Sequence, residues 1–277
     1  MMRIDAHQHF WRHDPVRDAW ITDEMGLLRR DFLPEELGGL LKAQGVDGSV
    51  AVQADQSEEE TRFLLDLAED HPFIQGVVGW VDLLAPDLDQ RLKHFSQRER
   101  FRGVRHIAQA EADDFLARED VIRGIGMLRE FGLTFDILVY PRQLPAALDL
   151  VRALPNQAFV VDHMAKPRIA DRVLEPWAAQ MREMASHANV RCKVSGLVTE
   201  AIWTGWRPEH FRPYLDIVFE AFGPERLMFG SDWPVCLLAA EYDEVLTSVE
   251  AYVQHLSAEE QAGVFGGNAA AFYGLKA

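Results

Sequence analysis

Two histidines separated by one residue, His7 and His9, are the first residues of this sequence whose types and spacing could do chemistry. They lie between Ile4 and Phe10, a segment that suits a short strand. Alternate side chains of a strand share a face, and two residues span about 6.5–7 Å. On a regular strand both imidazoles would project to one side and could bind one metal ion or two parts of one substrate. Such a pair also occurs as two polar residues on a half-exposed strand. Other residues of the chain are needed to distinguish a binding site from this alternative.

Composition narrows the classes of partner. The chain of 277 residues carries a formal net charge of −16, which argues against non-specific binding to nucleic acid or to an anionic membrane. A small molecule is the expected partner. No apolar run approaches the roughly 18 residues that a membrane span needs, and the N-terminus lacks the apolar core of a signal peptide. The two cysteines, Cys192 and Cys236, form no C-x-x-C motif, which indicates a reducing, cytoplasmic compartment.

Short β-like runs alternate with helical patterns along the whole chain. Ser57 and Glu60 form a capping box at a helix start, and Gly132 is placed to end another helix. No linker-like tract interrupts the pattern, and no G-x-G-x-x-G follows the first run. We therefore predict an α/β fold, a single (β/α)8 TIM barrel over residues 1–277. The expected strands are 3–9, 48–53, 74–81, 103–107, 134–140, 158–162, 190–195 and 227–230; the expected helices begin near 34 and 57 and cover 121–131, 144–154, 176–187, 208–222, 243–255 and 258–265.

In this fold the chemistry lies at the carboxyl ends of the strands. The sixth predicted strand ends in Asp162-His163, and the eighth is followed by Asp232. A carboxylate directly after an apolar run is costly unless it is paired, although Asp232 could also be a turn residue before Pro234. His7, His9, His163 and Asp232 together form an N3O set suited to zinc. They equally form an acid–base and oxyanion-stabilising set that needs no metal, and both alternatives stay open.

Further candidates lie beyond the strand ends. Arg105 could hold a carbonyl or hydroxyl oxygen, or form an outward salt bridge at the rim. His106 should point to the face opposite Arg105 if the strand is regular. Aromatic faces suit the C–H faces of a sugar ring and polar neighbours suit its hydroxyls, although each tryptophan could instead pack at the rim. The predicted substrate-binding residues are Trp11, Gln53, Asp82, His106, Trp203, Trp206 and Trp233.

Six motifs along the chain resemble those of the amidohydrolase superfamily, and within it the lactonase group. That group contains sugar lactonases and 2-pyrone-4,6-dicarboxylate lactonases, and the His-Gln-His-Phe-Trp sequence is similar to the sugar-lactonase branch. The motifs are Asp5 to Trp11, Arg102 to His106, Val161 to Pro167, Lys193 to Leu197, Phe229 to Pro234, and Gly267 to Leu275.

The resemblance implies roles for these residues. His7, His9, His163 and Asp232 match the family's catalytic and metal-binding positions. One divalent metal ion, zinc, is implied, although metal can be dispensable in the lactonase group. No lysine or glutamate stands where binuclear members place a bridging ligand, since Lys193 lies on the seventh predicted strand, so a second metal is not expected.

The expected activity is hydrolysis of a sugar lactone such as L-fuconolactone to the aldonic acid. Asp232 would act as general base, while the three histidines polarise the carbonyl directly or through one metal ion, with Arg105 assisting. The alternatives are a dicarboxylate-lactone hydrolase, for which Arg105 and Arg207 are the available arginines, a metal-dependent decarboxylase, and a non-catalytic barrel. The oligomeric state stays open.

Overall fold

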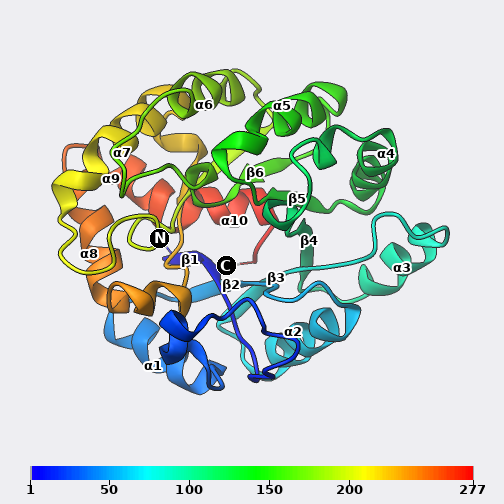
Figure 1. The fold of residues 1–277 in the computed structure, drawn as a ribbon. Coiled ribbons are helices and arrows are strands. Elements are labelled where there is room, and N and C mark those ends of the chain that lie inside the picture. Colours follow the sequence, from blue (N-terminus) through cyan, green and yellow to red (C-terminus); the bar gives the residue numbers. More distant parts are fainter. Residues whose placement is uncertain (1, 277) are drawn as a thin grey trace.

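The computed structural model describes residues 2–276 and forms a barrel of eight parallel strands surrounded by helices (Figure 1). Each strand pairs with the next one in the sequence, in the order β1 to β8. This confirms the predicted (β/α)8 barrel. The strands are β1 (Ile4–Gln8), β2 (Gly48–Val52), β3 (Ile74–Gly79), β4 (Phe101–His106), β5 (Thr134–Ile137), β6 (Phe159–Val161), β7 (Val190–Val194) and β8 (Leu227–Phe229).

The barrel is closed between its first and last strands by two backbone hydrogen bonds. The His9 amide donates to the carbonyl oxygen of Trp233 at 2.7 Å, and the Asp232 amide donates to that of His7 at 2.8 Å. Residues 7 and 9 are therefore fixed against residues 232 and 233 by the same bonds that complete the barrel.

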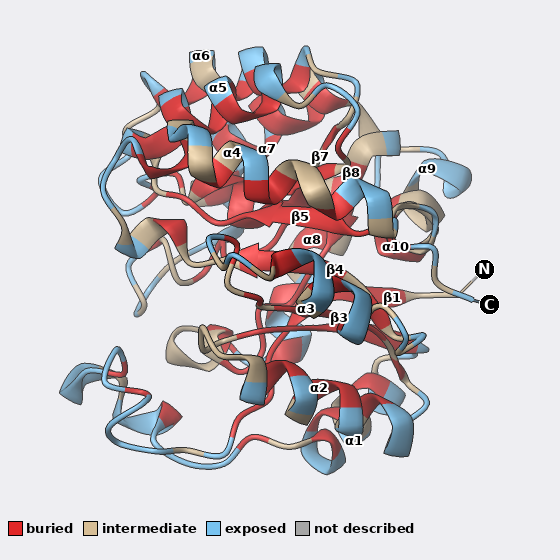
Figure 2. Ribbon diagram, turned by 90° about the vertical axis from the view of Figure 1, so that its right-hand side faces the viewer, coloured by how far each residue is buried: buried red, intermediate tan, exposed pale blue. Residues whose placement is uncertain are grey.

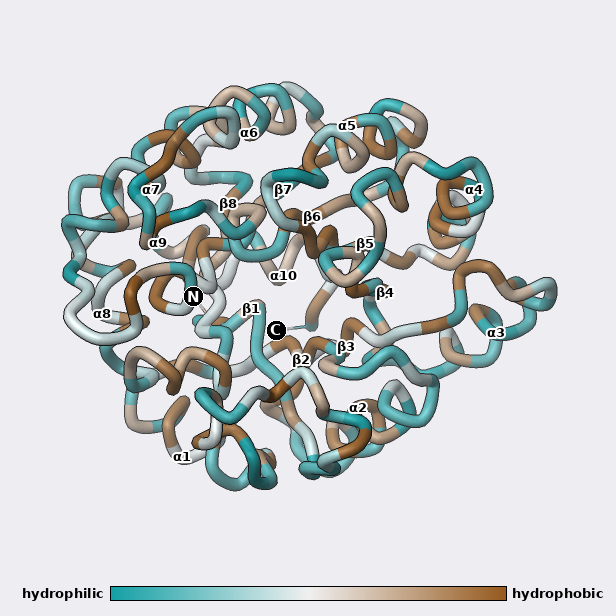
Figure 3. The backbone as a smooth tube through the Cα atoms, in the orientation of Figure 1, coloured by the Kyte–Doolittle hydropathy of each residue, from teal (hydrophilic) through white to brown (hydrophobic). Residues whose placement is uncertain are grey.

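The helices cover the outside of the barrel with one apolar face each (Figure 2). In α2, for example, Ser57 accepts a hydrogen bond from the Glu60 amide at the start, and Leu64 and Leu65 are buried. Figure 3 shows hydrophilic and hydrophobic residues alternating along the outer helices, as amphipathic helices require. The helices are α1 (Pro34–Ala43), α2 (Glu58–Asp70), α3 (Leu88–Phe95), α4 (Glu119–Met127), α5 (Leu144–Ala153), α6 (Trp177–Ala185), α7 (Pro208–Phe222), α8 (Tyr242–Val253), α9 (Ala258–Ala262) and α10 (Asn268–Tyr273).

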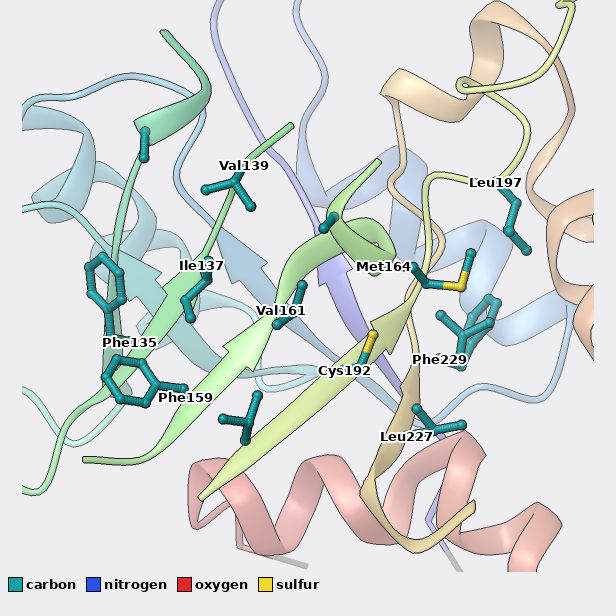
Figure 4. Close-up of a cluster of buried hydrophobic side chains, with 14 of the residues drawn as sticks. Phe135, Ile137, Val139, Phe159, Val161, Met164, Cys192, Leu197, Leu227 and Phe229 are labelled. Atoms are coloured by element: carbon teal, nitrogen blue, oxygen red, sulfur yellow. The ribbon is translucent and has the colours of Figure 1, made fainter. Parts of the chain in front are cut away.

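Strand alternation divides the buried residues into two cores. Phe135, Ile137, Phe159 and Val161 belong to the core between strands and helices, as does Cys192 (Figure 4). The other core fills the barrel interior, and α10 lies at the end of the barrel near both chain termini, which we call the lower end (Figure 2). Its buried members are Ile4, Ala6, Val50, Val52, Val78, Val160, Met228, Ala269 and Tyr273.

Helix α3 was not among the predicted helices. Its buried residues Leu88, Leu92 and Phe95 have helical spacing, but the helix has only eight residues. Within residues 2–276, no helix combines the length and the apolar character that crossing a membrane would require.

Candidate active site

A one-residue bulge in β1 directs His7, and His9 just beyond the end of the strand, into the barrel. Asp5 pairs with Ser49 of β2, but Gln8 pairs with Ala51, so β1 carries one extra residue between these pairs. As a result Ala6 joins the apolar interior while His7, the next residue, also points inward. Gln8 turns outward and donates to Ser49 Oγ at 3.1 Å. The predicted shared face of His7 and His9 is thus observed, on a strand that is not regular.

His163 and Asp232 both have left-handed backbone conformations, with φ of 51° and 60°. Such conformations cost roughly 1–2 kcal/mol for a residue other than glycine, and they concentrate at functional sites. Hydrogen bonds hold both residues in place. His163 Nδ1 lies 2.9 Å from Ser195 Oγ, and the Asp232 amide donates to the carbonyl oxygen of His7.

Two glycines make room for these side chains. A Cβ atom at Gly230 would lie 2.6 Å from Cβ of His7, and one at Gly196 would lie 2.8 Å from Nδ1 of His163. Gly196 also has a φ of 67°, which a residue with a side chain rarely adopts. The glycines of the two sequence motifs therefore serve close packing around the imidazoles.

The three imidazoles and the carboxylate converge at the mouth of the barrel. His9 Nε2 lies 3.2 Å from His7 Nε2 and 3.3 Å from Oδ1 of Asp232. His163 Nε2 lies 3.9 Å from the same carboxylate oxygen. The four residues predicted from the sequence are thus brought together, and the histidine and carboxylate atoms of His7, His9 and Asp232 are close enough to hold one metal ion.

Burial sets the protonation of this group. It lowers the pKa values of His7 and His163 well below the usual range, so both imidazoles are neutral. Burial also raises the pKa of Asp232, but the interactions with His163 and His9 outweigh burial and leave that pKa below its ordinary value. The site therefore combines a carboxylate base with neutral imidazoles at neutral pH.

Beneath these residues lies a second charged cluster, in which Lys193 is the central group. Its Nζ lies 2.6 Å from Asp136 Oδ2, 3.0 Å from Asp162 Oδ1 and 3.1 Å from His7 Nδ1. Tyr273 of α10 donates to Asp136 Oδ2 at 2.8 Å. Burial raises the pKa of Asp162, but Lys193 and the other nearby cationic groups hold that pKa well below its usual range. Asp136 and Tyr273 were not among the predicted site residues.

Arg105 belongs to this lower cluster and points inward. It donates to Asp162 Oδ2 at 3.1 Å, to the backbone carbonyl and side chain of Gln53, and toward His7 Nε2 at 3.3 Å. The arginine side chain is only 3% exposed. The alternative of an outward salt bridge at the rim is therefore wrong, because the guanidinium is turned into the barrel and paired there.

A cavity of about 350 Å³ opens above the convergent side chains. His9, His163, Asp232 and Arg105 form part of its floor and wall. Trp11 and Trp20 also line it; both come from the long segment after β1, which appears in deep blue in Figure 1. Its remaining lining residues are Ala54, Asp55, Gln56, Ile107, Gln109, Ala110, Leu138, Lys166 and Val235.

Among the predicted substrate-binding residues, the structure places Trp11 on the cavity wall and Gln53 below it, against Arg105. The others do not line the cavity, because their polar atoms are used or their rings are packed elsewhere. Asp82 accepts a hydrogen bond from the Leu84 amide, and His106 contacts Trp80 and Glu111. The indole N–H groups of Trp203 and Trp206 donate to the backbone carbonyls of Thr199 and Ala239, respectively. Trp233 is buried against Phe10 and Phe32.

Sequence reasoning gave no role to Gln56 or Gln109, and it placed Trp20, Asp55 and Lys166 near the strand ends without including them among the predicted site residues; all five line the cavity. Asp55 and Gln56 lie a few residues after the end of β2, and Gln109 lies a few residues after the end of β4. Their position after strand ends was a usable signal. Lys166 is the last residue of a run that begins at His163 and has left-handed backbone conformations. Nothing in the sequence Asp162-His163-Met164-Ala165-Lys166 predicts this conformation.

A parallel barrel with convergent imidazoles and a carboxylate at its mouth defines a TIM-barrel enzyme of the acid–base or metal-assisted type. A family model described as amidohydrolase matches residues 4–275, and the chain belongs to the amidohydrolase family. The resemblance stated from the sequence motifs is thereby confirmed.

Two relatives and one solved structure are similar over nearly the whole chain. The L-fucono-1,5-lactonase of Burkholderia multivorans is 46% identical, covering 99% of this chain and 96% of its own length. The L-fucono-1,5-lactonase of Burkholderia ambifaria is 41% identical, with 98% and 95% covered. The crystal structure of an amidohydrolase from Burkholderia multivorans with bound zinc matches with a TM-score of 0.96 at 46% identity, covering 100% of both chains.

Proposed function

We propose that this protein hydrolyses a sugar lactone, L-fucono-1,5-lactone or a closely related aldonolactone, to the aldonic acid. The observation that carries the proposal is the Asp232 carboxylate beside His9 and His163 at the floor of the cavity. The names of the two Burkholderia relatives support the substrate. Lactone hydrolysis requires an activated water, a site for the oxyanion and a proton for the departing alkoxide.

Asp232 takes a proton from water as the water oxygen attacks the lactone carbonyl. His163 and Arg105, which both line the cavity, stabilise the negative charge that develops on the carbonyl oxygen, assisted by His7 and His9. When the ring C–O bond breaks, Asp232 returns its proton to the departing ring oxygen. The product is the open-chain aldonic acid, which ionises to its carboxylate at neutral pH.

The residues present also fit a divalent metal ion such as zinc. His9 Nδ1 lies 2.7 Å from the carbonyl oxygen of Val52 and must carry the proton, which leaves Nε2 of a neutral ring bare at 3.3 Å from Asp232 Oδ1. Two lone-pair atoms at that distance need a proton or a cation between them. His7, His9, His163 and Asp232 would hold the metal, which would supply Lewis-acid polarisation of the carbonyl.

The charges around the cavity favour a sugar lactone over a dicarboxylate lactone. Of the two cationic residues that line it, Arg105 is committed to Asp162 and Gln53, and Lys166 lies 3.5 Å from Glu200. Each already faces a carboxylate of the protein, which disfavours binding of a second substrate carboxylate. Trp11, Trp20 and the aliphatic residues Ile107 and Leu138 offer surfaces for ring C–H groups and for the methyl group of a 6-deoxy sugar.

The cysteines bear on the compartment. Cys192 and Cys236 are both buried and unpaired, and burial raises their thiol pKa values. We assign the reaction to sugar catabolism in the cytoplasm, where free thiols are maintained.

The test is acid release, followed with a pH indicator, from a panel of lactones, using protein as isolated and protein treated with a chelator. We expect turnover of L-fucono-1,5-lactone, weaker turnover of its 6-hydroxy counterpart L-galactono-1,5-lactone, and none of 2-pyrone-4,6-dicarboxylate. Loss of activity in chelator, restored by zinc, would establish a metal requirement. Activity on the dicarboxylate alone, or release of CO2 from aromatic acids without lactone turnover, would overturn the proposal.

A further inference from the structure

Four glutamines lie close to the barrel mouth, and they differ in how far the protein uses their side-chain amides. Gln53 accepts a hydrogen bond from the Arg105 guanidinium through Oε1 and donates to the Arg105 carbonyl oxygen through Nε2. Gln143 accepts from the Tyr140 amide and donates to the carbonyl oxygen of Ala108. Because the protein uses both ends of these two amides, the side chains serve to hold neighbouring segments together.

The third glutamine, Gln56, is used at one end only. Its Oε1 accepts a hydrogen bond from the backbone amide of Ile107 at 2.7 Å. A backbone N–H can only donate, so this end of the side chain must be the oxygen. The Nε2 group makes no hydrogen bond with any residue between 2 and 276, and it is not enclosed by the protein. Since Gln56 lines the cavity, the two N–H donors of Nε2 are available to a ligand there.

The fourth glutamine, Gln109, makes no side-chain hydrogen bond within the described part of the chain, although its Oε1 is buried. Its backbone is fixed, because the amide donates to the carbonyl oxygen of Leu138 at 3.1 Å and the carbonyl oxygen accepts from Arg142. Gln109 also lines the cavity. A buried amide without a partner is unfavourable, and a ligand that can donate and accept hydrogen bonds would supply the partner.

Ile107 connects the two unused amides. Gln56 binds the backbone of Ile107, and Gln109 follows two residues later, so the segments after β2 and β4 form one wall of the cavity. The side chain of Ile107 lines the cavity as well. This wall therefore offers two neutral amides and an apolar side chain. Neutral amides suit hydroxyl groups, which both donate and accept, and they add no charge that would favour an ionic ligand.

We propose that Gln56 and Gln109 are specificity-determining residues that bind hydroxyl groups of the lactone ring, with Gln56 donating through Nε2. The inference rests on the proposed function and deepens it, because it identifies the hydroxyl groups as the feature that the enzyme selects. A lactone without hydroxyl groups would leave both amides without partners. Sites built to hydrogen-bond a substrate group discriminate strongly against analogues that lack this group.

The kinetic test compares L-fucono-1,5-lactone with δ-hexanolactone, which has the same ring and methyl group but no hydroxyl groups. Gln56→Met and Gln109→Met should each lower the ratio of the two kcat/KM values about five- to tenfold, as expected for the loss of one neutral hydrogen bond. Gln97→Met is the matched control, because Gln97 is exposed beyond the end of α3 and its replacement should leave the ratio unchanged. Equal losses with both lactones would overturn the inference, since displacement of Ile107 alone would affect the ring and methyl group that the two lactones share.

Binding of 1,5-anhydro-L-fucitol tests the inference without turnover, because this ring keeps the hydroxyl groups and the methyl group but has no carbonyl. In NMR titrations, Kd should be about five- to tenfold higher for Gln56→Met and Gln109→Met than for wild type or Gln97→Met. No binding to wild type, or the same Kd for all four proteins, would overturn the inference. Binding that depends on both glutamines, in a protein that hydrolyses no lactone, would refute the proposed function and leave the inference standing.

Discussion

Two charged clusters meet at His7 in the barrel, and they differ in how their charges are paired. In the lower cluster, Lys193 and Arg105 face the carboxylates Asp136 and Asp162, and the formal charges cancel. In the upper cluster, the single carboxylate of Asp232 faces imidazoles of which His7 and His163 are neutral. The lower cluster reaches no cavity except through Arg105, whereas the upper one is open to it.

The comparison shows that a buried charge with its counter-charges in place has a structural role, whereas a carboxylate without them can react. A buried charge whose counter-charges are in place mainly holds neighbouring groups. Arg105 is the exception in the lower cluster, because it lines the cavity and its Nε has no hydrogen-bond partner among the described residues. A carboxylate without a cationic partner can still take a proton or a cation. Asp232 meets this criterion and also lines the cavity, so it is the reactive group, although Asp5, Asp136 and Asp162 are buried in the same region of the barrel.

Replacing Asp232 with Asn tests the open cluster and should have the largest effect. The amide keeps the shape but cannot accept the proton of water, so kcat should fall by about 10²–10⁴-fold. Initial rates of acid release measure this, and circular dichroism should show an intact fold. Asp82→Asn is the control, because Asp82 lies outside the cavity and should be little affected. Near-normal turnover of Asp232→Asn would remove Asp232 as the base.

Replacing Arg105 with Met tests the paired cluster through stability. The change leaves Asp162 with one cation fewer in a buried position, and breaking a buried pair costs about 3–5 kcal/mol. Urea unfolding measures the free energy of unfolding. The exposed pair of Arg142 with Asp113 is the control, and Arg142→Met should cost less than about 1 kcal/mol. Equal losses in both variants would show that the lower cluster is not structural.

Glu60 is a buried carboxyl that belongs to neither cluster, and burial raises its pKa to about 8. The folded protein keeps this proton while the unfolded chain releases it near 4.5, so the unfolded state binds fewer protons and rising pH destabilises the fold between these values. Glu60→Gln removes this loss, which is on the order of 5 kcal/mol at most. Denaturant unfolding should find the variant more stable than wild type at pH 8 and equal to it at pH 4.

The matched control for Glu60 is its exposed neighbour Glu59. Glu59→Gln should leave the pH dependence of stability unchanged. Parallel pH profiles for wild type and Glu60→Gln would show that the buried carboxyl is ionised in the folded protein.

Replacing Trp20 with Ala should have the smallest effect, because this ring is partly exposed at the cavity mouth. Losing about 1 kcal/mol of contact would raise KM about fivefold with little change in kcat. Trp203→Ala is the comparison, since the Trp203 indole is bonded to Thr199 and lies away from the cavity. A larger KM effect at Trp203 than at Trp20 would restore the substrate contact predicted from the sequence for Trp203.

The sequence was sufficient for the fold and for the four convergent residues. Alternating apolar runs predicted every strand, and motifs at strand ends predicted His7, His9, His163 and Asp232. These signals are local, since each depends on the residues of one strand and the turn after it. The predicted strand ends were less accurate, and β5, for example, ends at Ile137 rather than at residue 140.

The lower cluster was not predictable in the same way. Asp136 is a single acidic residue inside an apolar strand, and Tyr273 lies in a helix at the opposite end of the barrel. Nothing in either segment indicates that the two hydrogen-bond across 137 residues of sequence. The bulge in β1 could not be predicted either, because a bulge is defined by the register of β1 against β2 and not by the residues of β1 alone.

The separation of these contacts along the chain has a consequence for folding. The Asp5–Ser231 hydrogen bond spans 226 residues and the His7–Lys193 bond spans 186. Contacts of such high contact order form after the local strand–helix units, since long loops must close first. An intermediate with β2 to β7 assembled would hold Lys193 beside both of its carboxylates but lack His7. Recovery of activity during refolding should therefore lag behind recovery of helical signal, and its rate would report the docking of β1 into an otherwise finished barrel.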